Sequence, residues 1–434
     1  MGYHIAPQKG ATDMMATGTP RVVVLGGGFG GLEAAFYLRM RLGDRARLTL
    51  VSDQDHFLYK PNTIYIPFGM DPDRLKIPLA RPTQRKDITF VQAHAREIYP
   101  GAKTVAADGS KLPYDFLVVA TGAGMRVDEV PGLGEYAQTI WTPSDMLRLR
   151  TAFTALPEQV REGGHPRIVF LVPPNNKCSG PLYEMVFMLD TWLRRQGVRG
   201  GVEITWSTYE EGFIQAFGPR LHEAVTAEFE RRGITGFNKY VVERVDKDEV
   251  VYRNGRRLPF DLLVSFPPYI ASTPFAGLPT DERGFIGTDL GTRQVVGQPD
   301  IYAVGDAGDF PVKQAFLAFL QADAAAEHLA ARILGTAPQI AFEPTSMCVM
   351  EQFDKATFAQ VPLRLTGLPA KPVEVRPDAL GKYKVGTSPA WRLGKMVLGM
   401  YLPWRFNAGN PFHAGLPWRG MEMGLKVMSR MLAA

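Results

Sequence analysis

The sequence contains very little cysteine and no recognisable metal-binding motif. Only Cys178 and Cys348 occur among 434 residues, which excludes a disulfide-rich secreted scaffold. No CxxC or HExxH spacing is present, and the seven histidines are scattered along the chain. We therefore expect a protein without a metal centre.

Long apolar runs and a dominant charge are also missing. No uncharged apolar stretch approaches the ~20 residues that a bilayer-spanning helix needs. Residues 1–19 lack the apolar segment and basic start of a signal peptide, so we expect a flexible arm and a cytoplasmic protein. The net charge is only +5. Because basic residues alternate with acids along stretches such as 220–233, we expect no nucleic-acid partner.

The first organised segment, residues 21–42, reads RVVVLGGGFGGLEAAFYLRMRL. A β-branched run, a glycine turn and an amphipathic helix follow one another, and Gly26, Gly28 and Gly31 fit the pattern G-x-G-x-x-G. This arrangement predicts a Rossmann-like dinucleotide site, with the diphosphate at the helix N-terminus. Asp53, at the end of the next strand, is the candidate ribose ligand. Ser52 is the competing candidate, and a plain turn role for Asp53 is the third alternative.

Two later motifs indicate which dinucleotide binds. Residues 112–123 end in Ala-Thr-Gly, with Thr121 and Gly122, and residues 292–309 contain Gly305 and Asp306. In this order and at this spacing, the motifs resemble those of the two-dinucleotide-domain flavoproteins of the glutathione-reductase-like group. The resemblance implies FAD, with Asp306 on its ribityl chain. It implies an FAD domain formed by 20–149 and 281–340, a second Rossmann-like domain over 150–280, and a C-terminal region over 341–434.

The second domain lacks the glycine turn that NADH would need. An apolar strand (167–173) and an amphipathic stretch (182–196) flank the turn PPNNKCSGP, in which Gly180 is the only glycine. We therefore expect no ordinary NADH binding. Cys178 stands in this turn, beside Lys177 and just before a helix that Pro181 should open. The helix N-terminus and the lysine predict a lowered thiol pKa and a reactive cysteine; the alternative is an inert cysteine that only fills space.

These features together resemble the sulfide:quinone oxidoreductases. The family pattern Cys-x-Gly-Pro-x-Tyr-Glu matches CSGPLYE, with Cys178 and Glu184, and the family's second cysteine matches Cys348 in MCVMEQFD. Lys313 in FPVKQAF matches a family lysine near the flavin. Many members carry a third cysteine, which in some binds FAD covalently, but the corresponding segment of this chain has Trp141, so FAD should be non-covalent.

The resemblance implies a mechanism. Hydrosulfide attacks a sulfur bridge between Cys178 and Cys348, and the electrons pass through FAD to ubiquinone or menaquinone. Glu184 is implied as a general base; the alternative is an acid that only caps the first helical turn. Lys313 is implied to stabilise negative charge on the reduced flavin. The implied quinone pocket lies in the C-terminal region, and its candidate residues are Phe353, Lys395 and Tyr401, with Phe353 at a position where the family has glycine.

The C-terminal residues favour attachment to a membrane surface. Residues 391–434 contain six lysines or arginines but only one acid, Glu422. Residues 418–434 predict an amphipathic helix with a basic polar face, suited to anionic lipid. The apolar face holds Trp418, Met421, Leu425, Met428 and Leu432, and Trp391, Trp404 and Trp418 should lie at headgroup level. The alternatives are a helix packed on the protein's own core and a contact between copies in a homo-oligomer.

The expected fold is therefore α/β, with two Rossmann-like domains and a C-terminal region that associates with the cytoplasmic membrane. Three other functions stay open. The flavoprotein subunit of a flavocytochrome c sulfide dehydrogenase shares the cysteine pair but works with a haem partner in the periplasm. A type II NADH:quinone oxidoreductase would need the second glycine turn. A non-catalytic redox sensor would need only the flavin and the thiols.

Overall fold

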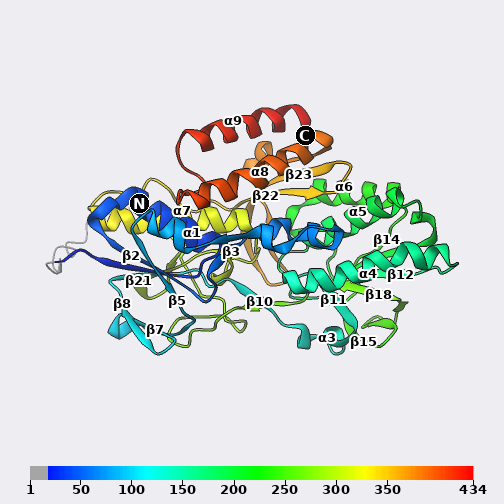
Figure 1. Ribbon diagram of the computed structural model, residues 1–434, viewed down its shortest axis with the longest axis horizontal. Helices are drawn as coiled ribbons and strands as arrows, with labels where there is room; N and C mark the ends of the chain where they lie inside the picture. The colour runs from blue at the N-terminus through cyan, green and yellow to red at the C-terminus, as the bar shows by residue number, and fades with distance from the viewer. Residues whose placement is uncertain (1–17, 434) are drawn as a thin grey trace, which may run out of the picture.

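The computed structural model describes residues 18–433, which form two parallel β-sheets side by side beneath a C-terminal layer (Figure 1). Each sheet has helices packed against it. The predicted fold class is confirmed in its two Rossmann-like units and its C-terminal helices. The predicted N-terminal arm lies almost wholly outside the described residues.

The first sheet has six strands in the order β20-β21-β9-β1-β2-β5. All neighbours are parallel except β20, which pairs antiparallel with β21 at the edge. Helices α1 (Phe29–Leu42) and α7 (Ala315–Leu334) lie together on one face. The strands are β1 (Arg21–Leu25), β2 (Arg47–Ser52), β5 (Ile88–Gln92), β9 (Phe116–Val119), β20 (Gln294–Val295) and β21 (Gln298–Ala303).

Glycine is required twice in the turn between β1 and α1. Gly26 has φ +108°, and a Cβ there would lie 2.2 Å from the carbonyl oxygen of Ala120. A Cβ on Gly31 would lie 1.8 Å from the carbonyl oxygen of Gly26. Both close approaches arise because the helix packs directly against the strand, as the glycine pattern predicts.

The second sheet has five parallel strands in the order β11-β18-β12-β13-β14. Helices α4 (Pro143–Arg161), α5 (Gly180–Arg195) and α6 (Pro219–Arg232) accompany it. Helix α4 begins in a capping box, in which Thr142 and Asp145 bond each other's backbone N–H. The strands are β11 (Ala137–Thr139), β12 (Arg167–Val172), β13 (Glu203–Thr208), β14 (Thr235–Phe237) and β18 (Leu262–Ser265).

Several small antiparallel units complete the two halves of the molecule. Two three-stranded meanders and two strand pairs connect the main elements. The meanders are β6 (Ala95–Tyr99), β7 (Thr104–Ala107), β8 (Ser110–Pro113) and β15 (Val242–Val245), β16 (Glu249–Tyr252), β17 (Arg257–Pro259); the pairs are β3 (His56–Leu58), β4 (Lys76–Pro78) and β10 (Ala123–Met125), β19 (Tyr269–Ala271).

The C-terminal layer consists of an antiparallel sheet and two helices. Strands β22 (Thr345–Glu351), β23 (Ala356–Leu368), β24 (Lys371–Val375) and β25 (Lys384–Ser388) precede α8 (Pro389–Asn407) and α9 (Gly415–Leu432). Strand β22 runs antiparallel to β23 and also contacts α5. The layer therefore brings residues near 348 to the helix that follows Cys178. None of the helices between residues 18 and 433 combines the length and apolar character needed to cross a bilayer.

Helix α9 forms as predicted, but its orientation corrects one expectation. Trp418 and Met421 pack against the core around α1 and α7, while Leu425 and Met428 pack against a smaller cluster centred on Trp391. The apolar face predicted to meet lipid is therefore largely the face that covers the protein. The prediction for Trp391 at headgroup level was also wrong, because this side chain is fully buried against Phe358 at 4.0 Å between ring centroids.

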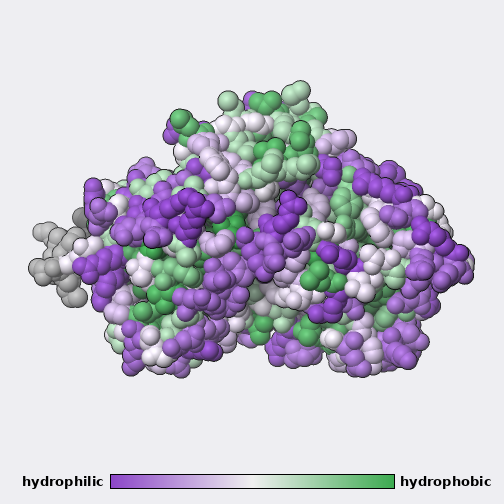
Figure 2. Space-filling view, viewed as in Figure 1, coloured by the Kyte–Doolittle hydropathy of each residue, from purple (hydrophilic) through white to green (hydrophobic). Residues whose placement is uncertain are grey.

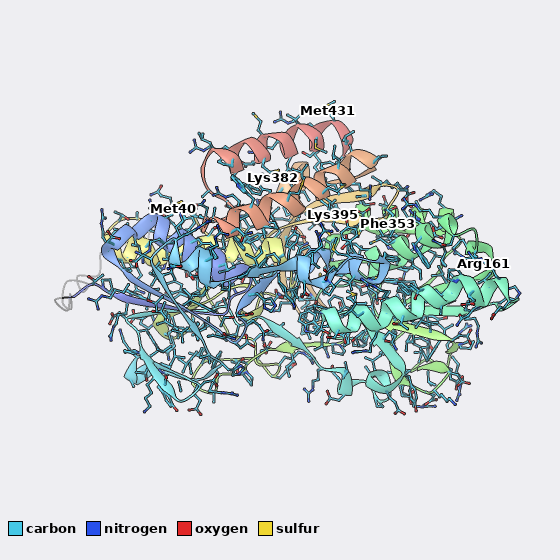
Figure 3. The ribbon with its side chains drawn as sticks, in the orientation of Figure 1. Met40, Arg161, Phe353, Lys382, Lys395 and Met431 are labelled. Carbon is cyan, nitrogen blue, oxygen red and sulfur yellow. The ribbon has the colours of Figure 1, made fainter. Side chains whose placement is uncertain are left out.

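A different set of apolar side chains is exposed on the C-terminal layer. Figure 2 shows a green patch over α8 and α9 at the top of the molecule, and Figure 3 shows Met431 at the outer surface of α9. We call this set the apolar crest. It consists of Leu393, Met396, Val397, Met400, Trp404, Leu416, Met423, Val427 and Met431, all at least 38% exposed.

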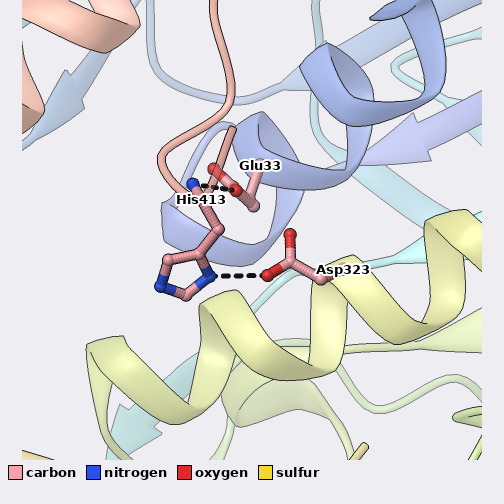
Figure 4. A group of neighbouring side chains, drawn as sticks. All are labelled: Glu33, Asp323 and His413. Carbon is pink, nitrogen blue, oxygen red and sulfur yellow. Dashed lines mark hydrogen bonds and ion pairs between the residues drawn. The ribbon is translucent and has the colours of Figure 1, made fainter. Parts of the chain in front are cut away.

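A buried group of acids and imidazole joins the loop between α8 and α9 to the first sheet's helices (Figure 4). Glu33 on α1 accepts the backbone N–H groups of Phe412 and His413 at 2.6 and 3.1 Å. Asp323 on α7 lies 2.6 Å from His413 Nδ1. Burial raises the pKa of Glu33 well above its usual value and raises that of Asp323 to about 7, while it lowers the pKa of His413 to about 4.

This group predicts a specific pH dependence of stability. The Asp323 carboxyl keeps its proton in the folded chain up to about pH 7, whereas the unfolded chain releases it near pH 4. The contribution of the Asp323 carboxyl to the free energy of unfolding is therefore complete below pH 4 and is lost as the pH rises towards 7. We expect Asp323→Asn to gain about 2 kcal/mol relative to the wild type between pH 5 and pH 8, measured by chemical unfolding. The exposed Asp248→Asn is the control; equal pH profiles for the two variants would contradict the prediction.

Candidate active site

One large cavity lies where the two sheets and the C-terminal layer meet. Its volume is about 660 Å³, and it is lined by residues from all three parts. Both cysteines line it. So do eleven other residues predicted for the site: Gly26, Gly28, Ser52, Asp53, Thr121, Gly122, Glu184, Gly305, Asp306, Lys313 and Lys395.

One end of the cavity is formed by the glycine turn. Gly28 is the N-cap of α1, and a Cβ placed on it would meet no atom within 4 Å, so its backbone borders open space. Asp53 is exposed and lies beside Gln54, whereas the buried Ser52 hydroxyl accepts the Gln54 N–H at 3.2 Å. Within residues 18–433, the exposed Asp53 carboxylate accepts only the Gln54 side-chain amide, at 3.4 Å, so it fits a ribose better than the buried Ser52 hydroxyl does.

Further along the cavity, the charges of Asp306 and Lys313 act on each other's pKa. Burial raises the pKa of Asp306, and the charges of Lys313 and Lys60 oppose that rise. Burial likewise lowers the pKa of Lys313 to about 7, with Asp306 opposing. Lys313 Nζ donates to the Gly308 carbonyl and lies 3.8 Å from the Phe285 ring centroid. A ligand bound between these two groups would meet a carboxyl group that can accept hydrogen bonds from hydroxyl groups and, beside it, a cation.

The turn before α5 places Cys178 on the cavity wall. Asn176 anchors it, because its amide donates to the Phe266 carbonyl at 2.7 Å and its side-chain oxygen accepts the Cys178 N–H at 3.0 Å. Asn175 adopts φ +63°. Side chains thus occupy the turn in which an NADH-binding protein would leave bare glycine backbone. Helix α5 carries Pro181 in its first turn, as predicted.

The predicted lowering of the Cys178 pKa was wrong. Burial raises the pKa of this thiol strongly, and the charges of Cys348, Asp306 and Glu184 act in the same direction. Only a hydrogen bond from the Gly180 N–H at the start of α5 lowers it. Loss of water therefore outweighs the helix N-terminus.

Cys348, on β22, faces the same cavity from the C-terminal layer. Burial raises its pKa to about 12; Glu184 adds to the rise and Lys395 opposes it. The two cysteines are 170 positions apart in the sequence. The charge of Cys348 nevertheless contributes to the raised pKa of Cys178, and Glu184 raises the pKa of both thiols. Neither thiol is in a disulfide.

Glu184 and Lys395 form a buried ion pair beside Cys348. Lys395 Nζ donates to Glu184 Oε1 and to the Val349 carbonyl, the latter at 2.9 Å. Glu184 also accepts the Glu351 N–H at 2.7 Å. Burial raises the pKa of Glu184, and Lys395 opposes the rise. The pair thus joins α5, β22 and α8 at the cavity wall, and Figure 3 shows Lys395 on the inner side of α8.

Sequence reasoning missed the charged group behind this pair. Glu351 is completely buried, yet it accepts the Tyr65 hydroxyl at 2.7 Å and Arg392 Nε at 3.0 Å. It also accepts the N–H groups of the two residues that follow it. Glu351 lies in the segment MCVMEQFD that matches the family's second cysteine, but the match assigned it no role, and the arginine three positions before Lys395 belongs to no motif.

A second omission is Lys60, which lines the cavity at the start of the 3₁₀ segment η2 (Lys60–Phe68). Its Nζ lies 3.4 Å from the ring centroid of Trp141, which is also a lining residue. Trp141 packs against Phe266 and Tyr269 at 5.9 and 5.8 Å. A single lysine in a loop carries no spacing signal, so only the folded chain reveals this pair.

Two predicted quinone-pocket residues lie apart from the cavity lining. Phe353 contacts Phe68 at 4.9 Å and lies below Arg195, with φ +68°. Glycine adopts that left-handed backbone more readily than phenylalanine does. Tyr401 is buried, and its hydroxyl donates to the Phe412 carbonyl at 3.2 Å. Of the three candidates, only Lys395 reaches the cavity.

The residues present fit FAD. The glycine turn offers bare backbone for a diphosphate, the exposed Asp53 carboxylate lines the same cavity, and we find no hydrogen-bond donor to the Asp306 carboxylate within residues 18–433. A partly buried carboxylate without donors that lines a cavity suits the hydroxyl groups of a ribityl chain. Trp141 carries no group that would attach a flavin covalently.

Comparison with known proteins agrees with this geometry. The model of the pyridine nucleotide-disulphide oxidoreductase family matches residues 20–160 and 193–325. The unmatched interval between them holds β12, the atypical turn and nearly all of α5. The "Sulfide-quinone reductase" of Aquifex aeolicus is 31% identical over 242 residues, which cover 54% of each chain.

Two further similarities have lower identity. The mitochondrial "Sulfide:quinone oxidoreductase" of Dictyostelium discoideum is 24% identical over 310 residues, 68% of this chain and 66% of that protein. The matches thus span between about half and two thirds of these relatives' own lengths. The crystal structure of the Aquifex aeolicus sulfide:quinone oxidoreductase superposes with a TM-score of 0.82 at 24% identity, over 94% of this chain and 96% of that one.

The superposition shows the same fold, and the family model covers more than half of the sequence. Together with the cavity that fits FAD, these findings confirm the predicted cofactor and enzyme class. The chain therefore belongs to the pyridine nucleotide-disulphide oxidoreductase family and is an FAD-binding oxidoreductase.

Proposed function

We propose that this protein oxidises sulfide with the cysteine pair and delivers the electrons through FAD to a membrane quinone. The observation that carries the proposal is that Cys178 and Cys348, from two separate parts of the chain, line the cavity that fits FAD. The relatives named for sulfide and quinone support it. We also propose the domain boundaries that the sequence predicts: an FAD domain over 20–149 and 281–340, a second domain over 150–280 and a C-terminal region over 341–434.

The sulfur chemistry proceeds by thiol–disulfide exchange. Hydrosulfide attacks one sulfur of a bridge between Cys178 and Cys348, which forms a persulfide on that cysteine and expels the other as a thiolate. When bound, FAD accepts an electron pair and passes it to a second acceptor. The thiolate and the persulfide give up this electron pair and one proton as they join again through a bridge that holds the added sulfur. That sulfur leaves as polysulfide or on an acceptor thiol, and the quinone finally takes two electrons and two protons.

The Glu184–Lys395 pair transfers protons and stabilises charge beside Cys348. A thiol with a pKa near 12 is a poor leaving group unless its charge is neutralised. Lys395 lowers that pKa and lies in the same wall. We assign Glu184 and Lys395 to proton transfer and charge stabilisation at the thiol, and Lys313 to charge stabilisation near the cofactor. Cys178 and Cys348 are the reacting residues.

The two faces of α8 connect the protein surface with the cavity and so provide a route for quinone. Lys395, Leu398 and Leu402 on its inner side line the cavity, while Leu393, Met396 and Met400 on its outer side belong to the apolar crest. A lipid-soluble acceptor that reaches the crest is thus one helix away from the cavity. We propose that the crest lies in the surface of the cytoplasmic membrane, with the basic residues of α9 near anionic headgroups.

The crest predicts a membrane-binding defect. Replacing both Met400 and Met423 with glutamate should weaken binding to anionic liposomes by about 100-fold, since each methionine contributes about 1.5 kcal/mol when buried in lipid. Co-sedimentation with liposomes measures the loss. Leu290→Glu, an exposed apolar position outside the crest, is the control. Unchanged sedimentation of the double variant would reject membrane attachment through the crest.

Two alternatives differ in their electron donor. An NADH:quinone oxidoreductase is disfavoured by the turn around Asn176 and Cys178, whose side chains occupy the diphosphate position. A flavocytochrome-type sulfide dehydrogenase would pass electrons to a haem partner instead of a quinone, which the apolar crest disfavours.

An anaerobic titration distinguishes these functions. Sulfide added to the FAD-loaded protein should bleach the flavin absorption band, and a short-chain quinone should restore it, while NADH should have no effect. Bleaching by NADH alone would favour the NADH oxidoreductase. A band reduced by sulfide but unaffected by quinone would favour a haem partner, and no response to sulfide would reject the proposal.

A further inference from the structure

Lys60 is a cavity cation without a carboxylate partner. Within residues 18–433, no acid lies at ion-pair distance from its Nζ, which instead lies 3.4 Å from the Trp141 ring centroid. The other two cavity lysines are held by polar groups, since Lys395 pairs with Glu184 and Lys313 donates to the Gly308 carbonyl. The charge of Lys60 is therefore directed at the contents of the cavity.

The electrostatics of Lys60 agree with this position. The Lys60 side chain is exposed where it lines the cavity. The surrounding protein lowers its pKa to about 8, and the charge of Asp306 opposes the decrease, so the ammonium group is still mainly protonated at pH 7. Once a ligand fills the cavity, less water screens this cation, and its interaction with negative charge on that ligand becomes stronger.

The contacts of Lys60 place it towards the thiol end of the cavity. Trp141 packs against Tyr269, and the pKa of Tyr269 is raised by burial and, to a lesser extent, by Cys178 and Asp306. Asp306 is also the acid that acts on Lys60. Lys60 and Trp141 therefore lie near Tyr269, which lines the cavity together with Cys178.

We propose that Lys60, held over Trp141, stabilises reduced FAD relative to oxidised FAD and so raises the reduction potential of the bound cofactor. Two-electron reduction with uptake of one proton leaves one negative charge on the cofactor, and a pre-positioned cation favours that form. The inference depends on FAD binding in this cavity, and it is independent of whether sulfide or quinone is the substrate.

The test is the midpoint potential of bound FAD, measured with a chemical reductant and a reference dye at fixed pH, without sulfide or quinone. Lys60→Met should weaken the preference for reduced FAD at least tenfold, a decrease of about 30 mV for two electrons. Lys60→Arg retains the charge and should stay within threefold of the wild type. Lys111→Met, at an exposed lysine on β8, controls for loss of net charge.

A second variant tests the role of the indole. Trp141→Leu removes the ring that holds the ammonium group, and it should shift the potential in the same direction by a smaller factor, whereas Trp141→Phe should shift it less. A Lys60→Met potential within a factor of two of the wild type would overturn the proposal. If Lys60→Met and Lys60→Gln bind no FAD while Lys60→Arg does, the charge serves binding of both forms, which also contradicts it.

Discussion

Cys178→Ser should reduce the rate of flavin bleaching by sulfide by at least about 1,000-fold, because removing a reacting nucleophile eliminates the step that depends on it. Serine keeps the shape of the turn and its hydrogen bond from Cys178 N–H to Asn176. It provides no sulfur for a bridge to Cys348. Cys348→Ser should cause a loss of similar size, since the two sulfurs act as one unit.

Stopped-flow absorbance under anaerobic conditions measures this effect. Bleaching by dithionite and recovery with quinone should be nearly unchanged in both serine variants, which shows that FAD and the acceptor site are intact. Met347→Leu, beside Cys348 on the cavity wall, is the volume-matched control and should bleach normally with sulfide. Bleaching of Cys178→Ser within tenfold of the wild-type rate would contradict the thiol mechanism.

Lys395→Met should destabilise the protein by about 3 kcal/mol at pH 8, because it leaves the buried Glu184 carboxylate without its cation. The defect should be smaller at pH 5. Without Lys395 the pKa of Glu184 rises further, so the carboxyl takes up a proton in the folded state and the stability that this provides is lost as the pH increases. Reduction of the flavin by sulfide should slow about 100-fold, as expected for loss of a group that transfers a proton and stabilises charge at the Cys348 thiol.

A double-mutant cycle separates the charge effect from simple loss of packing. Glu184→Gln in the Lys395→Met background should recover at least half of the lost stability, because no unpaired charge is then buried. Chemical unfolding at pH 5 and pH 8 gives the four free energies. Additive effects of the two substitutions would show that the ion pair contributes nothing to stability.

The parts of the site that depend on local spacing were predictable from the sequence. The glycine turn, the strand and helix around Cys178, and the acid at position 306 all follow from short motifs whose geometry is local. The meeting of Cys178 and Cys348 in one cavity was expected from the resemblance alone, since nothing in the spacing of two residues 170 positions apart specifies that they approach.

Properties that depend on burial were not predictable. The thiol of Cys178 lies at a helix N-terminus, as expected, but desolvation by the surrounding protein raises its pKa, and a local pattern cannot report this. Helix α9 has apolar side chains on more than one face, so the face that covers the core is decided by α8 and β25. Lys60 and Glu351 acquire their importance only from distant partners, Trp141 and Arg392.

The most direct test of the account is peptide mass spectrometry of the protein after anaerobic turnover with sulfide and quinone, digested under conditions that trap free thiols. The account predicts a cross-linked pair of peptides containing Cys178 and Cys348, with a mass that corresponds to a disulfide or to one inserted sulfur atom. Recovery of both cysteines only as separately alkylated thiols, in wild-type protein that turns over, would contradict it.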